Sequence, residues 1–276
     1  MIVDAHVHLL PERVRADPSV AMADPWFAAC HASPRAVLGS PEGLLDAMDE
    51  DGIDRAVCFT WPFADARLCA EANDWLAATV RRHPRRLIGF ATVQPADPGA
   101  AAEALRGARL GLRGLGELNA DAQGWSLDDL TALGDLVSAS VDADLPWTLH
   151  CSEPVGHQYP GKGTATPDRV ARLAEAHPEL RLIAAHLGGG LPFYAHMPEV
   201  AAMLRRNVWV DTAAAPFLYA DSAWRAVVDL CGADRVLLGT DWPLVRLARY
   251  RSALATLSET ERTGVAGGTA AGLLDA

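Results

Sequence analysis

Histidine and carboxylate side chains stand at spacings that suit metal chemistry. The motif DAHVH near the start of the chain contains His6 and His8, while His150, His186 and Asp241 each end a short apolar run. Residues i and i+2 of a strand share a face, so we expect His6 and His8 to point the same way. Neutral imidazoles and carboxylates bind Zn²⁺ and similar divalent ions. The pattern therefore predicts a metal site.

Predicted strands, which would position these residues, alternate with predicted helices along the chain. Short β-rich apolar runs are separated by Ala/Leu-rich segments with charges at helical spacing, which predicts a parallel sheet. Eight strands close a (β/α)₈ barrel. The rival, an open doubly wound sheet, usually has a glycine-rich phosphate turn after its first strand, and here that strand ends in His-Val-His. The predicted strands are Ile2–His8, Arg55–Thr60, Leu87–Val93, Leu112–Leu118, Pro146–His150, Arg181–His186, Val208–Asp211 and Arg235–Thr240. The predicted helices include Ala66–Arg82, Pro98–Arg109, Leu127–Ala143 and Pro167–His177.

We therefore expect residues 1–276 to form one distorted α/β TIM-barrel domain, with the active site at the C-terminal ends of the strands. In such a barrel the strand ends meet at one mouth, where Glu117 at the end of strand four would join the four histidines and Asp241. Unrelated polar residues that cap strands would explain any one position but explain the set poorly. Asp211 ends strand seven, where it either orients a group beside the metal or caps the strand.

On these residues the chain resembles the amidohydrolase superfamily, and within it the amidohydrolase-related (amidohydrolase 2) group of metal-dependent barrels. That group contains both hydrolases and non-oxidative decarboxylases. The resemblance spans the chain and rests on DAHVHLL, LHCSEPVGH, AHLGGGLPF, LLGTDWP and the closing helix GGTAAGLL.

The resemblance implies a role for each site residue. His6, His8 and Asp241 would bind the principal metal, with His150 as a further ligand. His186 would lie beside the metal, either as a ligand of a second ion or as a proton-transfer residue. Asp241 would also act as general base and acid on metal-activated water, whose pKa a divalent ion lowers to about 7.

We expect one ion, with Zn²⁺ favoured and Mn²⁺ as the alternative. Related binuclear sites often use a carboxylated lysine on strand four or five, but Lys162 lies in the loop beyond strand five. Glu117 is the available substitute, either as a bridge between two ions or as a carboxylate that orients a ligand histidine.

Substrate contacts are predicted from the loops that follow the strands. The loop after strand five contains Glu153, His157 and Lys162. Trp61 and Trp242 follow strands two and eight, where each would either form a wall of the pocket or simply pack in the core. Lys162 is the one lysine of the chain and a candidate anchor for a substrate carboxylate or phosphate; the alternative is an exposed lysine in a flexible turn. We expect Lys162→Ala to raise KM for an anionic substrate, and an unchanged KM would exclude the anchor.

The main functional prediction is a metal-dependent hydrolase of an amide, ester or lactone bond in a small carboxylated molecule. The alternative is a non-oxidative decarboxylase, or a hydratase, of an aromatic or unsaturated acid, because the same ligands serve both. A non-catalytic metal-binding barrel is the remote alternative.

The amino-acid composition disfavours some classes of binding partner. The 35 acidic against 24 basic residues give a formal charge of −11, which disfavours a nucleic-acid partner. No apolar run approaches the roughly 18 residues of a membrane span, and five scattered cysteines suit a reducing compartment. We expect a cytoplasmic enzyme with a small-molecule substrate, and a homodimer as the commonest assembly.

Overall fold

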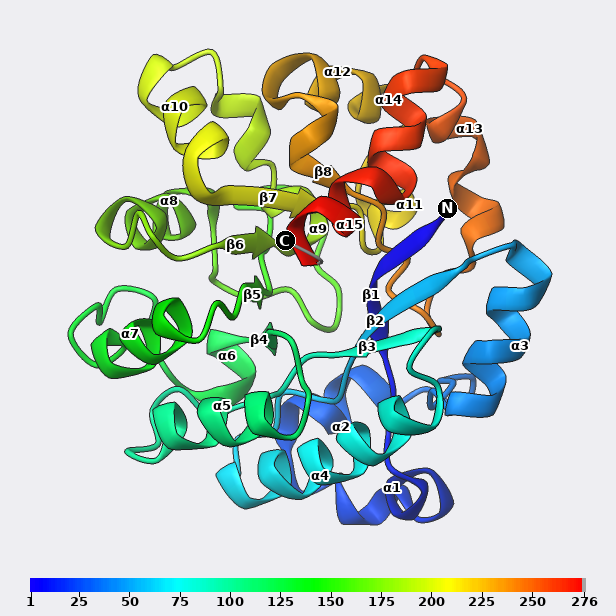
Figure 1. The fold of residues 1–276 in the computed structure, drawn as a ribbon, viewed down its shortest axis with the longest axis vertical. Coiled ribbons are helices and arrows are strands. Elements are labelled where there is room, and N and C mark those ends of the chain that lie inside the picture. Colours follow the sequence, from blue (N-terminus) through cyan, green and yellow to red (C-terminus); the bar gives the residue numbers. More distant parts are fainter. Residues whose placement is uncertain (275–276) are drawn as a thin grey trace.

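The computed structural model of the chain describes residues 1–274, in which eight parallel strands form a closed barrel (Figure 1). One sheet has the order β1-β2-β3 and the other β4-β5-β6-β7-β8. Isolated parallel bridges, Val7 to Trp242 and Ala91 to Leu115, join the two sheets on both sides. The strands are β1 (Val3–His8), β2 (Arg55–Phe59), β3 (Leu87–Gly89), β4 (Leu115–Leu118), β5 (Trp147–Leu149), β6 (Leu182–Ala184), β7 (Val208–Asp211) and β8 (Val236–Leu237).

Helices enclose the strands, most of them on the outside of the barrel (Figure 1). They are α1 (Glu12–Ala16), α2 (Pro25–His31), α3 (Pro41–Asp51), α4 (Ala66–Arg82), α5 (Ala100–Arg109), α6 (Ala120–Gln123), α7 (Gly134–Asp142), α8 (Pro167–Ala176), α9 (Ala185–Gly188), α10 (Pro198–Asn207), α11 (Ala215–Leu218), α12 (Ser222–Cys231), α13 (Arg251–Leu254), α14 (Glu259–Thr263) and α15 (Thr269–Leu274). Shorter helical turns are η1 (Pro18–Val20), η2 (Leu191–Tyr194), η3 (Ala233–Arg235), η4 (Leu247–Tyr250) and the π-helical η5 (Gly264–Gly268).

The predicted barrel is confirmed, and the predicted helix at Ala66–Arg82 has the bounds of α4. The prediction is wrong at the start of the segment 127–143, where only Gly134–Asp142 is helical. Just before it, the Ser126 hydroxyl and the Asp129 carboxylate accept hydrogen bonds from nearby backbone N–H groups. Such local bonds compete with helix formation.

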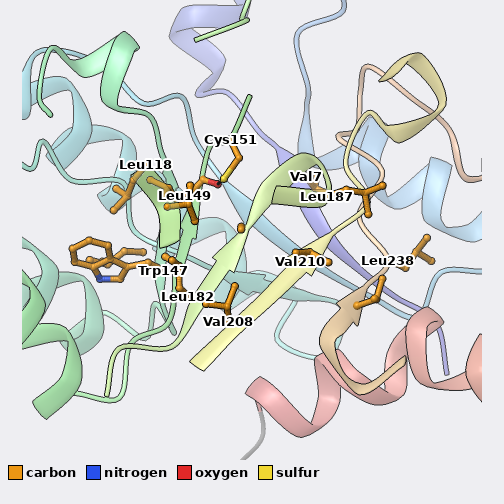
Figure 2. Close-up of a cluster of buried hydrophobic side chains, with 14 of the residues drawn as sticks. Val7, Leu118, Trp147, Leu149, Cys151, Leu182, Leu187, Val208, Val210 and Leu238 are labelled. Atoms are coloured by element: carbon orange, nitrogen blue, oxygen red, sulfur yellow. Dashed lines mark hydrogen bonds between the residues drawn. The ribbon is translucent and has the colours of Figure 1, made fainter. Parts of the chain in front are cut away.

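Two buried clusters show which end of the barrel is free for a site. Figure 2 shows the larger cluster, which includes Val7, Leu149 and Val210 and lies between strands and helices. The second joins inward side chains such as Val3 and Phe59 to α15. Because Val3 begins β1, α15 closes the N-terminal end of the barrel. The C-terminal ends of the strands are left for the site.

Irregular registers in β1 and β4 turn the site residues inward. Val3 and Ala5 belong to the inner cluster, whereas Val7 belongs to the outer one. Strict alternation would have put all three on the same face. The register of β1 shifts between Asp4 and Val7, and that of β4 shifts between Leu115 and Leu118. Such irregularities re-aim side chains and are frequent beside active sites.

Two long connections follow β1 and β5 at the open end. The first, residues 9–40, contains α1 and α2, and the second, residues 150–166, contains no helix or strand. None of the helices in residues 1–274 has the length and apolarity of a membrane-spanning segment.

Candidate active site

Three donor atoms meet where β1 and β8 end. The Nε2 atoms of His6 and His8 are 3.3 Å apart, and Asp241 Oδ1 lies 3.7 Å from the first and 3.5 Å from the second. Two nitrogens and one carboxylate oxygen at these separations form a group that could hold one metal ion.

The Nδ1 atoms of His6 and His8 each face an oxygen acceptor. His6 Nδ1 lies 2.8 Å from Asp211 Oδ2, and His8 Nδ1 lies 3.3 Å from the Thr60 carbonyl oxygen. Each Nδ1 therefore donates, which leaves both Nε2 lone pairs facing each other beside a carboxylate. Lone pairs so close repel each other unless a cation lies between them. The donor set thus fits a divalent metal, and oxygen partners behind ligand histidines are usual at metal sites.

Asp211 organises this side of the mouth. Besides His6, its carboxylate accepts the backbone N–H of His186 at 3.1 Å and that of Ala213 at 3.0 Å. One fully buried carboxylate therefore holds both the His6 imidazole and the turn after β6. Sequence reasoning left its role open, and its place at the end of β7 was the only signal.

Glu117 joins the remaining two histidines. Its Oε1 lies 3.0 Å from His150 Nδ1 and 3.2 Å from His186 Nε2. His6, Glu117 and His186 form a second group of potential metal ligands. His150 lies outside both groups, and its Nε2 is 2.9 Å from the carbonyl oxygen of Gly161 in the loop after β5. The ligand role of His150 stays a prediction, as does the choice between bridging and orienting roles for Glu117.

The carboxylates at the mouth of the barrel stabilise positive charge on the neighbouring histidines. Burial favours the neutral form of Glu117, yet the charge and hydrogen bond of His150 and the hydrogen bond of His186 hold its pKa well below the usual range. Burial likewise opposes protonation of His186, but the hydrogen bond and charge of Glu117 outweigh it and raise the pKa to about 10. For His6, burial is outweighed by the charge and hydrogen bond of Asp211, which raise the pKa to about 9. The cluster therefore holds a cation, either a proton or a metal.

Two site residues adopt left-handed backbone conformations. His186 has φ of 58° and Asp241 has φ of 65°. Residues other than glycine are uncommon in this region, and such strain clusters at functional sites. Each strained residue follows shortly after a strand, His186 after β6 and Asp241 after β8.

A pocket of about 650 Å³ opens above these groups. That volume suits a small ligand. His8, Glu117, His150, His186 and Asp241 lie in its wall, and most of the rest is apolar. The apolar part includes Trp26, Trp61, Pro62, Phe217, Leu218 and Leu244.

Of the predicted substrate contacts, the structure brings Trp61 and His157 into the pocket wall. Glu153, Lys162 and Trp242 lie outside it. Glu153 accepts hydrogen bonds from the hydroxyls of Tyr159 and Tyr219, and so ties the loop after β5 to the end of α11. Trp242 is 8% exposed and belongs to the outer core cluster.

The ammonium of Lys162 serves its own loop. It donates to the carbonyl oxygens of Val155 at 2.7 Å and His157 at 3.1 Å. A substrate anchor at Lys162 would have to give up these bonds, and the predicted rise in KM for Lys162→Ala remains the test.

Among the polar residues of the wall that sequence reasoning missed are His31 and Arg35. Both come from the connection after β1, whose conformation has no periodic signal. Among the described residues, Arg35 is the one lysine or arginine in the pocket wall.

The affinity of the metal-free protein for a divalent ion is expected to rise with pH until about pH 9. Below the raised pKa of His6, near 9, the imidazole carries a proton that an incoming ion must displace. Each pH unit below that value then weakens binding by about tenfold. Calorimetric titration with Co²⁺ from about pH 7 to pH 9.5 measures this, and equal affinities at the two ends would contradict it.

The amidohydrolase family model matches residues 3–276. The chain belongs to the amidohydrolase family. A similar curated protein is γ-resorcylate decarboxylase from Polaromonas sp. strain JS666, which is 26% identical over 284 residues, with 82% of this chain and 84% of that protein covered.

Solved structures share the fold along the whole chain. 5-Carboxyvanillate decarboxylase from Sphingomonas paucimobilis is 21% identical with a TM-score of 0.81, and the match covers 99% of this chain and 98% of that one. The enzyme of the same name from Novosphingobium aromaticivorans, solved with manganese and 4-hydroxy-3-methoxy-5-nitrobenzoic acid, is 21% identical with a TM-score of 0.80 and coverage of 100% and 96%.

These relatives correct the functional prediction. The chain is an enzyme of the amidohydrolase superfamily, but the similar proteins are named decarboxylases, so the predicted hydrolysis of an amide, ester or lactone is wrong. Nothing in the ligand set could separate the two reactions, because loops decide what reaches the metal. A divalent metal is supported, whereas the preference for Zn²⁺ is not, since the Novosphingobium structure contains manganese.

Proposed function

We propose that this protein is a metal-dependent, non-oxidative decarboxylase of a small aromatic carboxylic acid. The observation that carries the proposal is the cluster of three potential metal ligands, His6, His8 and Asp241, beside an apolar pocket walled by indole and phenyl rings. A flat ring fits such walls. The related decarboxylases of γ-resorcylate and 5-carboxyvanillate act on acids of this class.

We propose Mn²⁺ as the first ion to test, held by His6, His8 and Asp241. When bound, a divalent ion would supply a positive charge that holds and orients oxygens of the acid. The fixed Nδ1 partners of both histidines keep their Nε2 atoms aimed at that position.

The reaction consumes one proton and releases carbon dioxide. A proton must reach the ring carbon that bears the carboxylate; the bond from that carbon to the carboxyl carbon then breaks, and its electron pair restores the aromatic ring. We propose Asp241 as the residue that delivers the proton, because its side chain is 14% exposed in the pocket wall and can exchange protons with water.

Other charges in the pocket suit an anionic substrate. The positive charge of His186, which donates to Glu117 and to the Ala213 carbonyl oxygen, offsets the repulsion that the Glu117 carboxylate would exert on an anion. Arg35 adds an exposed guanidinium to the wall. Such groups attract a carboxylate before any bond breaks.

A paired screen tests the proposal. Manganese-loaded protein is incubated with hydroxylated benzoic acids and, separately, with aryl esters and lactones. We expect loss of at least one acid with release of carbon dioxide, and no turnover of the esters or lactones. Turnover confined to the esters or lactones would overturn the proposal.

A further inference from the structure

His31, the last residue of α2, has a fixed ring and a fixed tautomer in the pocket wall. Its imidazole stacks on Phe27, with ring centroids 4.1 Å apart and 22° between planes, and meets Trp61 edge-on at 4.8 Å. Its Nδ1 lies 3.0 Å from the Phe27 carbonyl oxygen, which can only accept a hydrogen bond. Nδ1 therefore carries the proton in the neutral ring.

The other ring nitrogen, Nε2, is left as a hydrogen-bond acceptor. Within residues 1–274 no group bonds to it, and it is not among the buried atoms that lack a partner, so it remains open to solvent. Burial lowers the pKa of His31 below its ordinary value. At neutral pH the imidazole thus presents a lone pair, whereas Arg35, also in the wall, presents only donors.

The ring of Trp61 lies between His31 and His8, one of the potential metal ligands. Trp61 contacts His8 on one side, with centroids 6.0 Å apart, and His31 on the other. All three side chains lie in the wall of the same pocket. A ring whose carboxylate lies at the cluster would therefore extend along Trp61 and bring its remote edge toward His31.

We propose that His31 Nε2 accepts a hydrogen bond from a hydroxyl group on the substrate's ring, at a position away from the reacting carboxylate. This inference rests on the proposed decarboxylation and identifies a residue that determines the specificity of that site. A site built to accept such a bond discriminates against analogues without the donor, because a polar group loses its partner when the pocket closes around them. A methoxy or second carboxylate group at the same position offers only lone pairs and is disfavoured.

Binding to the metal-loaded protein tests the proposal independently of turnover. The dissociation constants of salicylate and of 2,3-, 2,4- and 2,5-dihydroxybenzoate are measured by calorimetry, together with carbon dioxide release from each. We expect the wild-type protein to bind one dihydroxybenzoate about tenfold more tightly than salicylate, the effect of one neutral hydrogen bond.

Variants assign that preference to His31. His31→Phe keeps a flat ring against Phe27 but has no acceptor, so the preference should vanish while salicylate binding stays within about twofold. His31→Gln retains an acceptor oxygen and should restore part of the preference. His196→Phe, which changes an exposed histidine outside the pocket wall, should leave the preference intact.

The outcomes separate this inference from the proposed function. The role of His31 would be overturned if the wild-type protein shows no preference for a dihydroxybenzoate over salicylate. It would also be overturned if His31→Phe keeps that preference. Both conclusions hold even if carbon dioxide is released. A preference that disappears in His31→Phe, without carbon dioxide from any acid, would support the role of His31 as a binding residue and overturn the decarboxylase.

Discussion

The His8→Ala variant is expected to lose its divalent ion and all measurable decarboxylation. His8 Nε2 is one of three donor atoms in the candidate metal group, 3.5 Å from Asp241 Oδ1. Removing even an outer partner of a metal ligand typically costs about 10–100-fold in affinity, so loss of a direct donor should exceed about 100-fold. Elemental analysis of purified wild-type and variant protein, after equal loading with Mn²⁺, measures the change.

Two further variants define the number of ions. His157→Ala removes a pocket histidine outside both metal groups and should retain the ion, so it controls for any general effect of losing an imidazole. Glu117→Ala should retain one ion per chain if Glu117 orients a histidine, whereas a fall from two ions to one or none would show a bridge. Full metal content in His8→Ala would contradict the candidate site.

The Asp241→Asn variant is expected to keep most of its binding pocket and lose catalysis. Asparagine has nearly the volume of aspartate and retains a ligand oxygen, but its amide cannot deliver a proton near neutral pH. Removing a general acid typically costs about 10²–10⁴-fold in rate. Carbon dioxide release at saturating Mn²⁺ and saturating acid should therefore fall by that factor, while the dissociation constant of the acid changes much less.

Metal content must be measured on the same samples. A metal-loaded Asp241→Asn protein with a rate within about threefold of wild type would exclude Asp241 as the proton donor. His186→Gln, tested beside it, shows whether the imidazolium next to Glu117 contributes instead, because glutamine keeps a hydrogen-bond donor but has no charge.

Much of the fold could be predicted because its signals are local. The barrel follows from eight apolar runs that alternate with helical segments, and α4 could be delimited because Asp65 caps its start and Arg82-His83-Pro84 ends it. The pair His6 and His8 shares a face as the two-residue spacing predicts. One domain over residues 1–276 and a homodimer stay predictions.

The rest depends on contacts between distant segments. Asp211 is 205 residues from His6, and only the closed barrel brings its carboxylate to the imidazole. The register shift in β1 moves Val7 to the outer core although Val3 and Ala5 face inward, which no alternation pattern reveals. Lys162 was predicted as a substrate anchor because it is the one lysine of the chain, yet its ammonium donates a hydrogen bond within its own loop.

The most direct measurement follows the carboxyl carbon and the proton together. A dihydroxybenzoic acid labelled with ¹³C in its carboxyl group is incubated in D₂O with manganese-loaded protein, and with chelator-treated protein as the control. We predict metal-dependent release of ¹³CO₂ and a dihydroxybenzene product with one deuterium at the carbon that carried the carboxylate. Absence of ¹³CO₂ from every hydroxylated benzoic acid tested, with a full complement of metal bound, would contradict the central claim.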